Sequence, residues 1–110
     1  MRRENSRPSA PGAVVELEAP TLALAPPSMY QVMLHNDDYT SMEFVVLVLE
    51  KFFNMNGGRA VMVMQEVHMK GVAVCGIYTR DIAETKVSQV TEFSREHNFP
   101  LLCTMRKVEE

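Results

Sequence analysis

The sequence lacks the features that mark three broad classes of protein. It contains no run of about 18 apolar residues, so we expect no membrane-spanning helix. Arg2, Arg3 and Arg7 near the N-terminus are followed by no apolar stretch, which argues against a secretory signal. Lys and Arg total 11 and Asp and Glu total 14, a formal net charge of −3. Because binding to nucleic acid by phosphate neutralisation needs a basic surplus, we expect no nucleic-acid partner.

Residues for common catalytic chemistry are also scarce. Cys75 and Cys103 are the two cysteines, and both lie in apolar runs, which favours packed thiols over disulfides or nucleophiles. The pair Gly57–Gly58 lacks the Lys-Ser/Thr of a phosphate-binding loop. Four side chains could ligate a metal, although their spacing matches no closed zinc pattern: His35, Asp37, Asp38 and His68. We expect no enzymatic activity, cofactor or metal; a small metal- or cysteine-dependent enzyme is the alternative.

The first 27 residues differ in composition from the rest of the chain. They hold five of the six prolines and no aromatic residue. Such a composition buries too little apolar surface to offset the entropy of ordering. We therefore expect a flexible N-terminal extension over residues 1–27 and one folded domain over residues 28–110.

Apolar periodicity in the domain predicts the order β-α-α-β-α-β. Short apolar runs predict strands over 30–34, 72–78 and 101–105. Apolar residues at helical spacing predict helices from about 41 to 54, from 59 to 69 and from 80 to 96. Three strands and three helices in about 80 residues imply a two-layer α/β (α+β) sandwich, with helices on one face of a small sheet.

Local signals predict where these helices begin and end. Thr40 and Glu43 fit a capping box for the first helix, with Thr40 as the N-cap. Gly57–Gly58 is expected to interrupt the helical pattern, and Gly71 to end the second helix. Thr79 is expected to cap the third.

A polar cluster stands out between the first strand and the first helix. Asn36, Asp37 and Asp38 follow the strand directly, and His68 lies near the end of the second helix. An ordinary strand-to-helix turn explains the first three, and a satisfied helix-end histidine explains the fourth. If these ends converge, however, they bring an amide oxygen, carboxylates and an imidazole beside apolar neighbours.

Five short motifs closely resemble the ClpS family across residues 26–107. ClpS proteins are bacterial and plastid adaptors of the N-end rule that work with the unfoldase ClpA or ClpC. The resemblance implies a three-stranded antiparallel sheet packed against three helices. The motifs are Pro26–Pro27–Ser28–Met29–Tyr30, Asn36–Asp37–Asp38–Tyr39–Thr40, Met42–Glu43–Phe44–Val45, Ala83–Glu84–Thr85–Lys86–Val87 and Pro100–Leu101–Leu102–Cys103–Thr104.

The resemblance implies that the protein binds N-degrons, which are free N-termini whose first residue is Leu, Phe, Tyr or Trp. Residues matching Asn36, Asp37 and His68 surround the α-ammonium in the family. An ammonium has three donors and no acceptor, so it needs several converging acceptors. The implied apolar pocket holds the first side chain, with Met42 as a gate against Ile and Val. Its lining residues are Thr40, Met42, Val45, Met64, Val67 and Leu101.

The resemblance also implies partners and a location. Glu84 and Lys86 match positions that dock on the N-terminal domain of ClpA or ClpC. The extension over 1–27 matches one that engages the unfoldase during delivery. The protein is then expected to be a cytoplasmic monomer that delivers N-degron proteins for degradation. The second alternative is an interaction domain like that of the ribosomal stalk, with the same layers but no pocket.

Three positions depart from the family pattern. Ser41 stands where many members have proline, and we expect only slight loosening of the helix start there. His35 stands where an apolar residue is common. Asp81 replaces a frequent Glu, which keeps the charge and shortens the reach.

Overall fold

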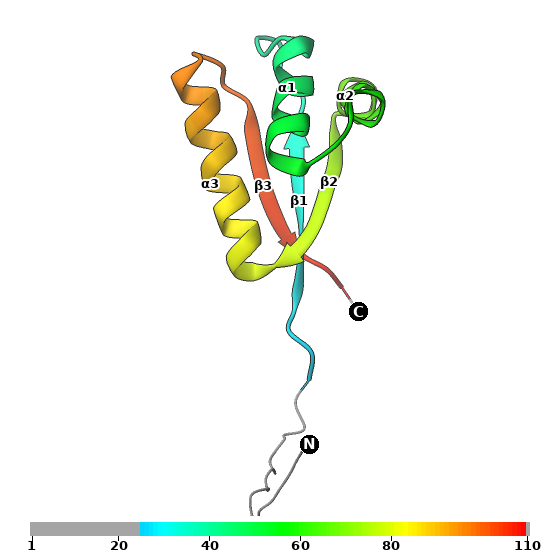
Figure 1. Cartoon of the computed structure of the whole chain (residues 1–110), viewed down its shortest axis with the longest axis vertical. Coiled ribbons are helices and arrows are strands. Elements are labelled where there is room, and N and C mark those ends of the chain that lie inside the picture. The colour runs from blue at the N-terminus through cyan, green and yellow to red at the C-terminus, as the bar shows by residue number, and fades with distance from the viewer. Residues whose placement is uncertain (1–24, 110) are drawn as a thin grey trace, which may run out of the picture.

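The computed structural model describes residues 25–109 and forms the predicted order of elements within them (Figure 1). The predicted extension over 1–27 lies almost wholly outside the described residues. The domain predicted over 28–110 is described up to residue 109. The elements are β1 (Met29–His35), α1 (Met42–Phe53), α2 (Gly57–Lys70), β2 (Val72–Thr79), α3 (Arg80–Glu96) and β3 (Leu102–Lys107).

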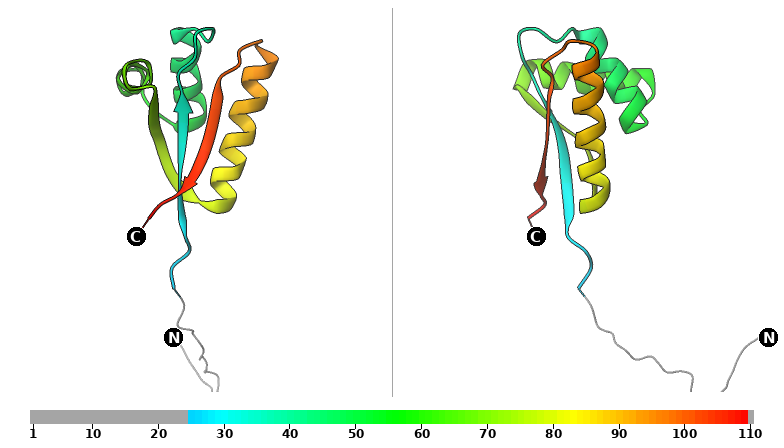
Figure 2. Two further views of the ribbon diagram at one scale, coloured as in Figure 1. Left: turned by 180° about the vertical axis from the view of Figure 1, so that it is seen from behind. Right: turned by 90° about the vertical axis from the view of Figure 1, so that its left-hand side faces the viewer.

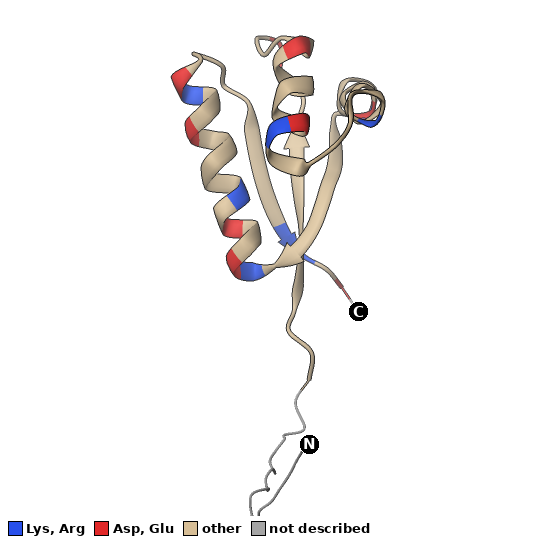
Figure 3. Ribbon diagram, in the orientation of Figure 1, with Lys and Arg blue, Asp and Glu red and all other residues tan. Residues whose placement is uncertain are grey.

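The described strands form one antiparallel sheet in the order β2-β1-β3. The helices lie on one side of this sheet, as its edge-on view shows (Figure 2). The predicted two-layer fold is therefore confirmed. β1 and β2 carry no charged residue, so the charges lie mainly on the helices and at the end of β3 (Figure 3).

The core forms where alternation in β1 meets the apolar stripes of the helices. Val32 and Leu34 point to the same side of β1 and are fully buried. Val48 and Leu49 of α1 and Val90 of α3 are buried with them. Burying each such side chain contributes roughly 1.5–3 kcal/mol. This packing holds β1 rigidly, and the loop after β1 inherits that position.

The start of α1 corrects one prediction. Ser41, not Thr40, is the N-cap: its Oγ accepts a hydrogen bond from the Phe44 N–H at 3.1 Å. The Thr40 hydroxyl donates instead to the Asp37 carboxylate at 2.7 Å. A proline at position 41 has no side-chain acceptor, so serine adds a cap at this position.

The junction between α1 and α2 differs from the prediction that Gly57–Gly58 interrupts the helical pattern. Gly57 and Gly58 form the first turn of α2 and do not separate the helices. The break lies before them, at Asn54, which ends α1 in a left-handed conformation with φ of 56°. Asn56 then caps α2 by accepting a hydrogen bond from the Arg59 N–H.

One further cap and one strand differ in detail from those predicted. Thr79 occupies the N-cap position of α3, but its side chain makes no capping hydrogen bond. β3 runs over 102–107 and not 101–105, because its ladder with β1 continues to the pair Tyr30–Lys107. Gly71 ends α2 as predicted, with φ of 88°.

Candidate functional site

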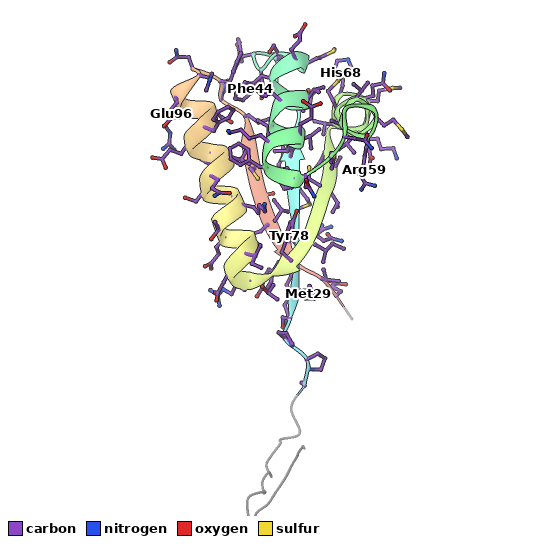
Figure 4. The ribbon with its side chains drawn as sticks, viewed as in Figure 1. Met29, Phe44, Arg59, His68, Tyr78 and Glu96 are labelled. Carbon is purple, nitrogen blue, oxygen red and sulfur yellow. The ribbon has the colours of Figure 1, made fainter. Side chains whose placement is uncertain are left out.

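The end of β1 and the end of α2 are tied together by backbone hydrogen bonds. The Asn36 N–H donates to the Gly71 carbonyl at 2.9 Å. The Gly71 N–H donates in turn to the Val67 carbonyl, also at 2.9 Å. Because Gly71 adopts a left-handed conformation, the chain leaves α2 directly toward β2. The loop that begins at Asn36 therefore lies beside the last turn of α2, which carries His68 (Figure 4).

A cavity of about 250 Å³ lies between this loop, the start of α1 and the last turns of α2. One part of its wall is polar and the other is apolar, so a guest must offer both kinds of surface. The polar residues are Asn36, Asp37, Asp38, Thr40 and His68, and the apolar ones are Met42, Val45, Met64 and Val67. Pockets for drug-sized ligands measure roughly 300–1,000 Å³, so this one suits a single amino-acid residue.

The Asp37 carboxylate organises the polar loop. Its Oδ1 accepts hydrogen bonds from the Tyr39 N–H at 2.8 Å and from the Thr40 N–H at 2.7 Å. Its Oδ2 accepts one from the Thr40 hydroxyl at 2.7 Å. This side chain therefore fixes the loop that leads into α1, besides facing the cavity.

These hydrogen bonds also set the charge of Asp37. Partial burial favours the neutral acid, but the Thr40 hydroxyl and the two backbone N–H groups favour the carboxylate. Together they hold the pKa of Asp37 below its ordinary value. The cavity therefore keeps a fixed negative charge at neutral pH.

Three of the other polar side chains that line the cavity are free to bind a guest. Asn36, Asp38 and His68 are exposed, and their side chains form no hydrogen bond with another residue of the described chain. An amide oxygen, a carboxylate and an imidazole nitrogen are all acceptors. They line the same cavity as four apolar side chains, which is the combination that a cationic group with an apolar neighbour requires.

The structure brings most of the predicted site residues together. All three predicted ammonium ligands line the cavity, as do five of the six predicted pocket residues. The exception is Leu101, which is buried but is not among the lining residues. The sequence analysis named Asp38 as a possible metal ligand but not as an ammonium ligand, although it lies in the Asn36–Thr40 motif and lines the same cavity.

The two predicted docking residues lie at the opposite end of the sheet, near the start of α3 (Figure 1). Glu84 is exposed and forms an ion pair with Arg80 at 3.1 Å. The Lys86 ammonium donates to the carbonyl of Phe52, in the last turn of α1, at 2.6 Å. It also lies 5.7 Å from the centre of the Tyr78 ring. Lys86 thus links two helices within the domain.

The geometry gives no support to catalysis by cysteine or by metal. Cys75 and Cys103 are buried, and burial raises the pKa of each thiol to about 12. Since the thiolate is the reactive form, neither is activated. Across residues 25–109, no group of three or more His, Cys, Asp or Glu side chains is placed to hold a metal ion. In the same residues, no helix is long and apolar enough to cross a membrane.

Comparison with known families gives one match over most of the chain. Residues 25–104 match the family described as ATP-dependent Clp protease adaptor protein ClpS. This range contains every residue that lines the cavity. The resemblance that the motifs indicated is therefore confirmed.

Similar proteins and a solved structure agree with this match. An adapter protein ClpS of Xanthomonas oryzae pv. oryzae is 52% identical over 107 residues, covering 97% of this chain and 99% of its own. One of Vibrio cholerae serotype O1 is 56% identical over 91 residues, covering 83% and 86%. The structure of Agrobacterium tumefaciens ClpS2 bound to L-phenylalaninamide is similar, with a TM-score of 0.74 and 43% identity. It covers 76% of this chain and 100% of that one.

Proposed function

Because the chain belongs to the ClpS family of adaptor proteins for the ATP-dependent Clp protease, we propose that its cavity binds the first residue of N-degron proteins. The bound protein then passes to the unfoldase partner of the protease. One observation carries the proposal: a single small cavity joins a polar wall of free acceptors to an apolar wall. A free N-terminal Leu, Phe, Tyr or Trp offers the matching pair, an α-ammonium beside a bulky apolar side chain.

The polar wall suits the α-ammonium in number and in charge. Asn36, Asp38 and neutral His68 each offer an acceptor, and Asp37 adds a fixed negative charge while it holds the loop. An internal peptide nitrogen has one N–H and no charge, so it leaves most of these acceptors unpaired. Unpaired acceptors in a partly buried site cost binding energy, which is how the cavity excludes internal residues.

The apolar wall suits the first side chain. Val45 and Val67 form its buried part, while Met42 lies at the exposed edge and Met64 is intermediate. Methionine chains are flexible and polarizable, so one wall accepts both Leu and the aromatic residues. Met42 acts as a gate that disfavours first residues branched at Cβ, such as Ile and Val. One misplaced methyl group of the guest weakens binding by about 1–3 kcal/mol.

A related complex supports this assignment. The Agrobacterium tumefaciens ClpS2 is bound to L-phenylalaninamide. That compound carries a free α-amino group, a benzyl side chain and a carboxamide in place of the next peptide bond. It therefore stands in for an N-terminal phenylalanine, and the corresponding guest of this chain is the first residue of a protein.

Delivery requires a second surface, which we assign to the start of α3. Glu84 is exposed there, and the N-terminal domain of ClpA or ClpC is the proposed partner. Lys86 contributes indirectly, because its ammonium is bound to Phe52 and holds α3 against α1. The two functions then lie at opposite ends of a cytoplasmic monomer, so a substrate and the unfoldase can be bound together.

Fluorescence anisotropy with labelled peptides tests the binding proposal. The peptides differ only at the first residue: Leu, Phe, Val, and Leu with an acetylated amino group. We expect tight binding of free Leu and Phe, weaker binding of Val, and loss of binding for the acetylated peptide. Equal binding of all four, or no binding of any, would contradict the proposed function.

A pull-down with the N-terminal domain of the unfoldase tests the docking surface separately. Glu84→Arg reverses the charge at the start of α3 and should weaken capture. Glu96→Arg makes the same change at the other end of the helix and serves as the control. Equal capture of the two variants would remove Glu84 from the docking surface.

A further inference from the structure

The methionines fall into groups that differ in exposure and in distance from the cavity. Met62 and Met69 are 70% and 82% exposed and lie on α2 outside the cavity. Met33 and Met55 are buried. Met42 and Met64 line the cavity, and of these Met42 is 48% exposed while Met64 is packed against the core. Met42 is thus the one described methionine that is both a cavity wall and half open to solvent.

The position of Met42 is fixed by its neighbours. It is the first residue of α1, directly after the N-cap Ser41, whose Oγ is bound to the Phe44 N–H. The backbone therefore cannot withdraw the side chain from the cavity without losing the cap. A small oxidant in water reaches this thioether at the position where a bound side chain touches it.

We propose that Met42 is a modification site, at which oxidation of the thioether by hydrogen peroxide to the sulfoxide closes the cavity to apolar N-termini. This inference rests on the proposed function of the cavity. The sulfur lone pair attacks one peroxide oxygen, the O–O bond breaks, and that oxygen stays on sulfur. The other oxygen leaves as water after proton transfer, so thioether and peroxide give sulfoxide and water.

The product changes the wall of the cavity chemically. A sulfoxide is polar and chiral, whereas the thioether is apolar and adaptable. When Leu or Phe covers the sulfoxide oxygen, that oxygen loses water and gains no donor from the guest. An uncompensated polar group of this kind weakens binding by about tenfold or more. The acceptors of the polar wall are unchanged, so the affected contact is the one with the first side chain.

The cysteines do not offer a competing route. Cys75 and Cys103 are buried and largely protonated, because burial holds their pKa values near 12. Peroxide reacts with thiolates, so these thiols react slowly. In the described residues, the sulfur atoms open to oxidation are therefore those of exposed methionines. Methionine sulfoxide reductases reverse that product, so the change can serve as a switch.

The test follows oxidation and binding together on the full chain. Protein is treated with graded hydrogen peroxide, the sulfoxide at each methionine is quantified by peptide mass spectrometry, and anisotropy is measured with the Leu peptide. Untreated protein is measured first, because failure to bind at that stage contradicts the proposed function and not the switch. We expect Met62 and Met69 to oxidise first without effect, and affinity to fall about tenfold as Met42 oxidises.

Two variants separate Met42 from the other methionines. Met62→Leu/Met69→Leu removes the two most exposed of the described thioethers outside the cavity, leaving that of Met29, and should still lose affinity on treatment. Met42→Leu, compared with its own untreated affinity, should keep that affinity, and reductase treatment should restore the unaltered protein. Complete conversion of Met42 to the sulfoxide with unchanged peptide affinity would overturn the inference. An equal loss of affinity on treatment of Met42→Leu would also overturn it. Absence of sulfoxide at Met42 while Met62 and Met69 are fully oxidised would also overturn it.

Discussion

The two ends of the sheet differ in how their polar side chains are used. At the cavity end, Asn36, Asp38 and His68 are exposed, and within the described chain their side chains have no hydrogen-bond partner. At the start of α3, Glu84 is paired with Arg80 and Lys86 with the Phe52 carbonyl. Unpaired acceptors that converge on a hollow are groups reserved for a guest. Paired groups mainly stabilise the domain. Substitutions at the cavity end should therefore lower peptide affinity with little change in stability, and substitutions at the start of α3 should lower stability with little change in affinity.

The largest effect is expected from Asn36→Ala. It removes an acceptor for the α-ammonium, and a hydrogen bond to a charged group is worth about 1.5–3 kcal/mol, or roughly 10- to 150-fold in affinity. The side chain is exposed and unbonded, so thermal stability should hardly change. Anisotropy and a melting curve measure the two quantities, with Gln89→Ala on the exposed side of α3 as the control. Unaltered affinity would exclude Asn36 from the site.

Lys86→Met should show the reverse signature. It leaves the Phe52 carbonyl at the end of α1 without its donor, and the free energy of unfolding should fall by about 1–3 kcal/mol. Affinity for the Leu peptide should stay the same, because the cavity lies at the other end. Glu84→Gln, which removes only an exposed ion pair, should cost under about 1 kcal/mol. Equal stability of both variants would mean that Lys86 is not a structural link.

Thr40→Val tests how far the loop depends on Asp37. It keeps the shape of the side chain but removes the hydroxyl that donates to the Asp37 carboxylate. A hydrogen bond to a carboxylate is worth about 1.5–3 kcal/mol. The two backbone N–H donors to Asp37 remain in this variant, so peptide affinity should fall by only part of that amount, roughly 2- to 10-fold. The matched control is Thr85→Val, which removes a hydroxyl bonded within α3. An equal change in both would contradict a specific role for the loop.

The smallest effect concerns pH. The pKa of Asp37 is lower in the folded protein than in the unfolded chain, so its stabilising contribution is fully present above the unfolded value of about 3.9. It is lost as pH falls through the lower, folded value. Denaturant unfolding between pH 2 and pH 6 should therefore show that the free energy of unfolding falls as the pH is lowered, and that this fall is smaller in Asp37→Asn. Identical pH curves for the two proteins would contradict this.

The order of elements could be predicted because apolar spacing records which face of each element is buried. Val32 and Leu34 alternate in β1, and Val48 and Leu49 lie on one stripe of α1. The length of β3 could not be predicted as well, because a strand continues as far as the neighbouring strand, here β1, offers hydrogen-bond partners. The ladder extends to the pair Tyr30–Lys107, which the local sequence of β3 does not reveal.

The sequence does not show which of two neighbouring polar residues forms the N-cap of α1. Thr40 and Ser41 are both good N-caps, and the choice depends on Asp37, whose carboxylate takes the Thr40 hydroxyl. Lys86 posed a similar difficulty, because its partner Phe52 lies 34 residues away along the chain. The resemblance to a family gave the cavity residues their roles, whereas their convergence depends on the Asn36–Gly71 hydrogen bond, which joins residues far apart in the sequence.

The most direct measurement is an NMR titration of the isotope-labelled protein with the free-amino Leu peptide, which reports on both ends at once. Amide shifts should move in the segments 36–45 and 64–71, and those at the start of α3, residues 80–86, should stay still. The acetylated peptide should leave both regions unchanged at the same concentration. Shifts confined to the start of α3, or equal shifts with the acetylated peptide, would contradict the claim that the cavity binds a free N-terminus.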